Sequence, residues 1–285
     1  LAAGAIILLF FSVVVMKQKS ISEVSTSSII LKNLEGILSG AEVSLGTVNS
    51  VAIPKTKMEF ECNRYRIGKV SKEFEVMSIF TPGTIESNKL ITWTLDWSLP
   101  YRVTNLLYLT SPRVRYVFVG ENGCITSDTC FAKKVFNSTP VEIRKELIEA
   151  NDVAGIRDKG DDQVRIIFFG SSNFIDTNDP VPTYLENMHK GTLTALNVDG
   201  DEDTGTLEFF EINDVNNKFV NKGTSYYIRE PALLGAIFAD DINIYNCVIL
   251  INHIICMETQ KESHKKTDLI WRIFMIFLEN DYQNE

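Results

Sequence analysis

The chain has 285 residues, of which 45% are hydrophobic and 23% charged, so a largely disordered chain is excluded and a membrane anchor with a folded body fits. The formal net charge is -9, and no stripe of lysine and arginine offsets it, which disfavours nucleic-acid binding. Only three histidines are present, which disfavours a histidine-rich metal centre.

Residues 1–16 form an uncharged apolar segment, LAAGAIILLFFSVVVM. As a helix they would extend about 24 Å. The hydrocarbon core of a bilayer is about 30 Å thick and requires roughly 20 residues, so the segment is slightly short. Because the segment opens on Leu1, we expect the membrane helix to begin upstream. It lacks the small-residue cleavage site of a signal peptide, which favours a retained single-pass anchor. Lys17 and Lys19 follow it and by themselves favour a cytoplasmic body.

Residues 17–50 are expected to form an amphipathic helix behind the anchor. Apolar residues recur every seven positions at Val24, Leu31, Leu38 and Leu45, which predicts one apolar stripe. The stripe either packs on the chain's own body or forms a stalk for self-association or a protein partner. This layout resembles that of type IV pilin-like subunits, although no glutamate stands near the start of the apolar run. The resemblance would imply a surface filament.

Residues 51–247 are predicted to form one globular α/β domain. Residues 91–98 alternate between apolar and polar, as in a strand with one buried face, and VRYVFV at residues 114–119 is a second strand. Ser98 can cap a helix over residues 99–109 between them. The three segments together predict a βαβ unit with a parallel pair of strands.

The second half of this domain continues the same pattern. Thr139, Pro140 and Glu142 carry the signals of a helix start, which predicts a helix over residues 139–150. Strands are expected at 164–169 and 224–228, a hairpin at 192–198 and 206–212, and helices from Pro231 and Asp241. The predicted fold is therefore α/β, with a mixed, partly parallel sheet, flanking helices and an antiparallel edge.

Two polar loops follow predicted strands, at the place where open parallel sheets bind ligands. Neither loop matches a phosphate-binding glycine motif, and ordinary turn chemistry accounts for the same residue types. The candidate ligand-binding residues are Gly120, Asn122, Gly170, Ser171, Ser172 and Asn173.

The hairpin loop carries alternating carboxylates at Asp199, Asp201 and Asp203, a spacing that suits calcium. It departs from the EF-hand because Thr204 and Phe210 replace the loop glycine and the bidentate glutamate. A solvated acidic hairpin tip is the alternative. No other cofactor is predicted.

No catalytic residues are predicted, because no nucleophile, base and orienting group occur in a recognisable motif. His189 is the one histidine before the C-terminal segment, and nothing in the sequence places it near Cys124.

Five cysteines stand at positions 62, 124, 130, 247 and 256. Cys124 and Cys130 enclose a loop that a disulfide can close, although two unrelated thiols would give the same pattern. A helix would place Cys247 and Cys256 on opposite faces, so Cys62 and Cys247 are a candidate long-range pair, with Cys256 left over. The cysteines, with a glycosylation triplet at Asn137, favour an extracytoplasmic body.

The composition changes near residue 248, and residues 248–285 contain a charged run and an apolar segment too short to span a bilayer. A membrane-surface helix and a shifted reading frame are both open interpretations of this tail.

Residues 91–118 and 233–238, with Asp240 and Cys247, resemble uncharacterised single-pass membrane proteins of small-genome archaea. The resemblance implies an archaeal cell envelope and points to no particular activity or site residue. We therefore expect a membrane-anchored, extracytoplasmic binding or scaffolding domain without catalysis. The alternatives are a pilin-like filament subunit and a membrane-tethered enzyme.

Overall fold

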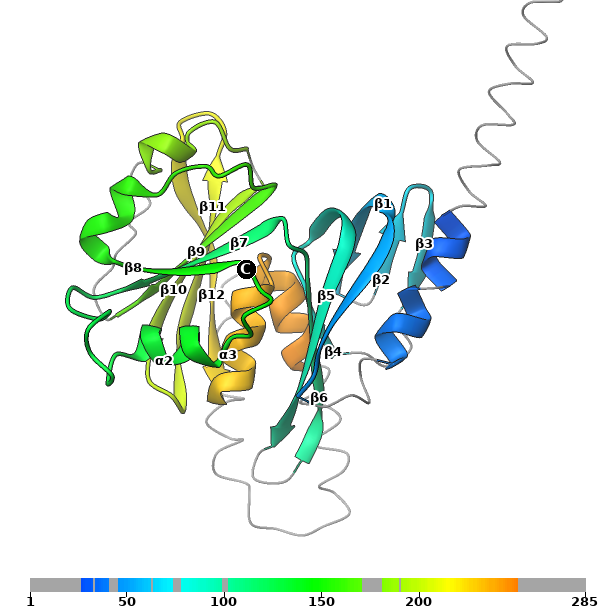
Figure 1. The fold of residues 1–285 in the computed structure, drawn as a ribbon, viewed down its shortest axis with the longest axis horizontal. Helices are drawn as coiled ribbons and strands as arrows, with labels where there is room; N and C mark the ends of the chain where they lie inside the picture. Colours follow the sequence, from blue (N-terminus) through cyan, green and yellow to red (C-terminus); the bar gives the residue numbers. More distant parts are fainter. Residues whose placement is uncertain are drawn as a thin grey trace, which may run out of the picture.

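The computed structural model describes residues 27–32, 34–40, 46–62, 64–73, 78–98, 102–170, 181–189 and 191–250. The predicted membrane helix at 1–16 and nearly all of the predicted tail lie outside these residues, as does Cys256. Among the described helices, none is long and apolar enough to cross a membrane. The described chain forms two mixed six-stranded β-sheets with few helices (Figure 1).

The first sheet, sheet A, is antiparallel except at one edge, where β4 pairs with β6 in parallel. Its strands in spatial order are β3 (Val70–Glu73), β2 (Arg64–Ile67), β1 (Val48–Glu61), β5 (Thr84–Ser98), β6 (Arg102–Thr110) and β4 (Ser78–Phe80). Helical residues 27–32 and 34–40 cover one face, with Leu31, Leu34 and Leu38 buried in a shared core. At these positions the predicted apolar stripe therefore packs on the chain's own body.

The second sheet, sheet B, has four parallel strands followed by two antiparallel ones. In spatial order they are β8 (Lys145–Glu149), β7 (Val114–Gly120), β9 (Gln163–Phe169), β10 (Leu193–Gly200), β11 (Thr204–Asn213) and β12 (Lys218–Ile228). The central strands β7 and β9 are buried on both faces, which explains their nearly continuous apolar sequences. Helix α2 (Phe131–Ser138) lies on one face, and the short helices η1 (Ala150–Gly155) and η2 (Thr183–Leu185) connect the parallel strands.

Helix α3 (Arg229–Phe238) and helical residues 242–250 lie between the two sheets (Figure 1). The ring of Phe238 lies 5.3 Å from that of Tyr108 in sheet A and 5.1 Å from that of Tyr116 in sheet B. Burying such a side chain contributes about 1.5–3 kcal/mol. The main core therefore joins both sheets through α3.

The C-terminal end of α3 is held by a buried arginine from sheet B. Arg165 donates from Nε to the Ile237 carbonyl at 2.9 Å and from Nη2 to the Ala236 carbonyl at 2.8 Å. Burial lowers the pKa of Arg165 to about 10, so the guanidinium stays charged at neutral pH. Asp240, just after the helix, accepts a hydrogen bond from the Gly83 backbone N–H at 2.7 Å. These polar contacts add to the apolar junction between the sheets.

Residues 91–119 do not form the predicted βαβ unit. The predicted helix at 99–109 is wrong, because residues 102–110 form strand β6, which pairs antiparallel with β5 through contacts such as Trp93 opposite Tyr108. Leu106, Leu107 and Leu109 are all buried because both faces of sheet A are covered. A continuous apolar run of this kind is compatible with a helix or a two-sided strand, and only the partner strand decides between them.

The predicted helix at 139–150 is also wrong. The preceding residues form α2 instead, and Thr139 ends it by donating its N–H and hydroxyl to the Val135 carbonyl. Residues 145–149 then form the edge strand β8, in parallel register with β7. Because this pairing links residues about thirty positions apart, it overrides the local helix signals.

Several predicted elements are confirmed, namely the strands at 114–119, 164–169 and 224–228, the hairpin around the acidic loop, and the helices from Pro231 and Asp241. The partly parallel sheet with an antiparallel edge is confirmed in sheet B. The fold class is corrected from α/β to mostly β, because residues 102–110 and 145–149, which were predicted to be helical, are paired strands.

Both expected disulfides are present. Cys124 is bonded to Cys130 with their Cα atoms 5.2 Å apart, and Cys62 is bonded to Cys247 with a Cα separation of 5.5 Å. The second bond links the end of β1 to the helix at 242–250. Structural disulfides persist in oxidising compartments, so the pair supports an extracytoplasmic body.

Candidate functional site

A pocket of about 490 Å³ lies at the C-terminal ends of the parallel strands of sheet B; we call it the switch-point pocket. From β7 the chain passes to β8 on one side and then returns to β9 on the other, so the strand order reverses at β7. Ligands bind at such reversals because the loops diverge there and leave a crevice. The loops after β7, β9 and β10 and the start of α2 line the pocket.

The pocket brings together parts of both loops predicted from sequence. Asn122 and Gly170 line it, together with Asp199 from the acidic hairpin, while Ser171, Ser172 and Asn173 lie outside the described residues. Asn122 is held in place because its Oδ1 accepts the Asn151 N–H at 3.3 Å. The two loops therefore contribute to one site, as expected for neighbouring parallel strands.

Gly120 has a packing role that turn chemistry alone does not describe. A Cβ atom at this position would lie 2.3 Å from the Cys124 Sγ and 3.3 Å from the Ala132 Cβ, so only glycine lets the disulfide pack against the end of β7. Gly170 has a φ of 147°, a conformation that disfavours other residues. The disulfide and the two glycines shape the wall of the pocket.

The acidic hairpin loop uses its central carboxylate for its own turn. Asp201 Oδ1 accepts the backbone N–H groups of Asp203 at 2.8 Å and Thr204 at 3.0 Å, and these bonds lower the pKa of Asp201. Asp199 faces the switch-point pocket, whereas Asp203 lines a different one. Across residues 27–250, wherever the structure is described, no group of three or more His, Cys, Asp or Glu residues could hold a metal ion.

The described lining of the switch-point pocket lacks a nucleophile paired with a base. The hydroxyls of Ser127 and Thr129 lie 2.9 Å apart and hydrogen-bond to each other. Glu121 and Asp199 supply carboxylates, but His189 lies elsewhere, where its backbone N–H donates to Thr192. The arrangement offers hydrogen-bonding groups and negative charge, which suit binding.

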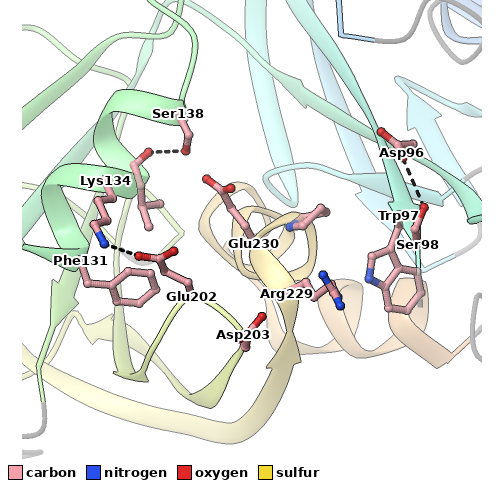
Figure 2. A pocket seen from close by; sticks show the side chains of 12 residues that line it. Asp96, Trp97, Ser98, Phe131, Lys134, Ser138, Glu202, Asp203, Arg229 and Glu230 are labelled. Atoms are coloured by element: carbon pink, nitrogen blue, oxygen red, sulfur yellow. Dashed lines mark hydrogen bonds and ion pairs between the residues drawn. The ribbon is translucent and has the colours of Figure 1, made fainter. Parts of the chain in front are cut away.

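A second pocket, also of about 490 Å³, lies between the two sheets; we call it the inter-sheet pocket. The end of β5, α2, the acidic turn and the start of α3 line it, and Figure 2 shows their side chains. Lys134 of α2 is paired with Glu202 of the acidic turn across one side. The sequence did not reveal this pocket, because its walls come from four segments that only the tertiary fold brings together.

Two unusual residues face the inter-sheet pocket. Trp97 is only 3% exposed, yet its Nε1 has no hydrogen-bond partner, a loss of about 1–3 kcal/mol for a buried donor. Arg229 adopts a φ of 67°, a left-handed conformation that costs an arginine roughly 1–2 kcal/mol. Its backbone N–H donates to the Asp203 carbonyl at 2.6 Å, which holds the junction of β12 and α3 in this shape.

Comparison with known proteins adds no relative. No protein-family model, no curated protein and no solved structure matches the chain. In its described residues the chain combines two mixed sheets around a central helical layer, two disulfides, and the switch-point and inter-sheet pockets.

Proposed function

We propose that this chain is a membrane-anchored, extracytoplasmic domain of the cell envelope that binds a ligand in the switch-point pocket and does no chemistry. The supporting observation is that the loops after β7 and β9 line one pocket at the reversal of strand order. The two disulfides support the compartment. The anchor rests on the apolar sequence of residues 1–16.

Binding accounts for the lining better than catalysis does. Asn122 and Ser127 are held by hydrogen bonds, and Glu121 and Asp199 add acceptor atoms and negative charge. Placed polar groups in a concave site give orientation and specificity to a bound molecule. Catalysis by a serine or threonine nucleophile would need an activated hydroxyl, and the Ser127 and Thr129 hydroxyls of the described lining hydrogen-bond to each other.

The test is a pair of tryptophan substitutions in the Cys124–Cys130 loop. Thr129→Trp places a large ring in the pocket, whereas Thr126→Trp adds the same ring at an exposed position outside its lining. Sugars, amino acids and nucleosides are screened one at a time by saturation-transfer NMR on the detergent-solubilised chain. We expect at least one of them to bind the wild type and Thr126→Trp but not Thr129→Trp. Equal binding by both variants, or no binder in the set, would refute a ligand role for this pocket. Chemical conversion of a binder would favour the enzyme.

A pilin-like filament subunit is the second candidate. It is favoured by helical residues 27–32 and 34–40, which lie along the largely antiparallel sheet A and bury Leu31, Leu34 and Leu38 there. Self-association through these three positions is then excluded, so a filament contact would have to use other residues. The genomic sequence upstream of Leu1 separates the candidates: a short basic leader with a prepilin-type cleavage site supports the filament, and an ordinary anchor removes it.

A further inference from the structure

One edge of sheet A is basic in a chain that is acidic as a whole. We call the following part of the molecule the basic edge: strands β1, β2 and β3, the turn that joins β2 to β3, and the helical residues 27–32 and 34–40 that cover them. It carries seven lysines and arginines against four glutamates, whereas the whole chain has a formal net charge of -9. The cations are Lys32, Lys55, Lys57, Arg64, Arg66, Lys69 and Lys72. Ion pairs within the edge, such as Arg66 with Glu59, leave its excess of positive charge unchanged, so the edge attracts anionic surfaces.

The connection to the predicted anchor starts at this edge. The register of β2 with β3 leaves Gly68 and Lys69 as the two-residue turn at the tip of their hairpin, with Gly68 at a φ of 58°. A Cβ atom on Gly68 would lie 3.3 Å from the Ser27 Oγ, which places the first described residue of the chain beside this tip. Figure 1 shows the helical residues that follow, in blue, next to β3. The exposed Lys69 is therefore close to the point from which the chain leads back to residues 1–16.

Chain length keeps this tip near the bilayer. Residues 17–26 separate the predicted anchor from Ser27, and these ten residues span at most about 35 Å when fully extended. At the start of the helical segment Ile29 is 59% exposed, and Lys32 in the next turn is also exposed. Exposed lysines around an apolar side chain suit contact with a layer of anionic lipid headgroups.

We propose that the basic edge is a lipid-contact surface, which holds the body against the bilayer by binding anionic headgroups. Lys32 and Lys69 attract the headgroups, and Ile29 enters the interface between them. The inference rests on the anchor in the proposed function, because the anchor brings the edge to the bilayer, and it does not depend on the switch-point pocket. In Figure 1 sheet B lies on the other side of sheet A from the blue helical residues, so the switch-point pocket stays clear of the bilayer.

The experiment measures how close Ile29 lies to the headgroups. The full chain, with ¹³C-labelled isoleucine methyl groups, is incorporated into nanodiscs in which a small share of the lipid carries a gadolinium chelate on its headgroup, and the gadolinium broadens the signals of nearby methyl groups. Ile29→Val assigns the Ile29 signal, and Ile125, which is 44% exposed in the loop after β7, is the reference. In mixed phosphatidylcholine and phosphatidylglycerol we expect strong broadening of Ile29 and weak broadening of Ile125. The broadening of Ile29 should decrease in phosphatidylcholine alone and in about 1 M salt, where the Debye length is about 3 Å.

Two double variants, each of which removes two positive charges, provide the matched comparison. Lys32→Gln with Lys69→Gln should lower the ratio of docked to undocked body at least about tenfold, because each lysine at an anionic bilayer raises the affinity several-fold. Lys218→Gln with Lys222→Gln removes the same charge from β12 in sheet B and should leave the broadening of Ile29 unchanged.

Three results would overturn the inference. Equal broadening of Ile29 in neutral and anionic nanodiscs would show that the connection to the anchor alone keeps it near the lipid. Unchanged broadening in the variant of Lys32 and Lys69, or an equal loss in the variant of Lys218 and Lys222, would show that the basic edge does not bind the headgroups. A chain that fails to enter nanodiscs would refute the anchor and this surface together, whereas failure of the Thr129→Trp test would refute the pocket and leave this surface in place.

Discussion

Replacement of Arg165 by methionine is expected to destabilise the protein by about 2–4 kcal/mol. In the native protein the guanidinium makes three hydrogen bonds, two to the last carbonyls of α3 and one from Nη1 to the Thr194 hydroxyl at 3.0 Å. Each charge-assisted bond is worth about 1.5–3 kcal/mol, and the carbonyls of Ala236 and Ile237 would be left buried without this donor.

An opposing contribution reduces this sum. Burial lowers the pKa of Arg165 to about 10, which means that the folded protein holds this charge at an unfavourable site, and methionine removes that penalty of about 3 kcal/mol. The net loss therefore falls below the gross value of the hydrogen bonds. It is still a large part of the 5–15 kcal/mol that stabilises a typical protein.

The assay is urea unfolding followed by tryptophan fluorescence, because the buried Trp93 and Trp97 lie in the core that α3 completes. Arg113→Met is the matched control: this arginine is half exposed and forms a surface ion pair with Asp162, which contributes little because water screens it. If Arg165→Met cost no more than Arg113→Met, the proposed cap of α3 would not stabilise the junction between the sheets.

Three further predictions concern pH, packing and cross-linking. Burial raises the pKa of Asp240 to about 6, so between pH 4 and 6 the folded state keeps a proton that the unfolded chain releases, and stability should fall by up to about 3 kcal/mol as pH rises. Asp240→Asn, which keeps the acceptor oxygen, should flatten this dependence in urea midpoints; an unchanged slope would assign it to other groups. Gly235→Ala places a methyl group 2.5 Å from the Phe80 ring and should lower the free energy of unfolding, measured by thermal unfolding, by about 1–3 kcal/mol. Gly36→Ala, at a helical position with open space around it, should instead raise it by up to about 1 kcal/mol. Cys62→Ser removes a disulfide that links residues 185 positions apart and should lower the free energy of unfolding by about 2–5 kcal/mol. A thermal midpoint equal to that of the wild type within the error of repeated melts would contradict this prediction.

Part of the candidate site was predictable from the sequence. The loops after residues 114–119 and 164–169 were candidate ligand-binding loops because each follows a predicted strand of a parallel sheet, and Asn122 and Gly170 of these loops line one pocket. The role of Gly120 was not predictable, since the need for glycine comes from the approach of Cys124. The inter-sheet pocket left no sequence signal either, because lining residues such as Trp97 and Arg229 are separated by more than a hundred positions.

The sequence by itself determined the elements whose signal is local. The β-branched runs that became β7 and β9, the hairpin around the acidic loop, and the short spacing of Cys124 and Cys130 each specify a structure within a few residues. The tertiary structure decided the rest. Residues 102–110 and 145–149 are strands because β5 and β7 offer them partners, and strand pairing draws its free energy from residues distant in the chain, which no local pattern contains.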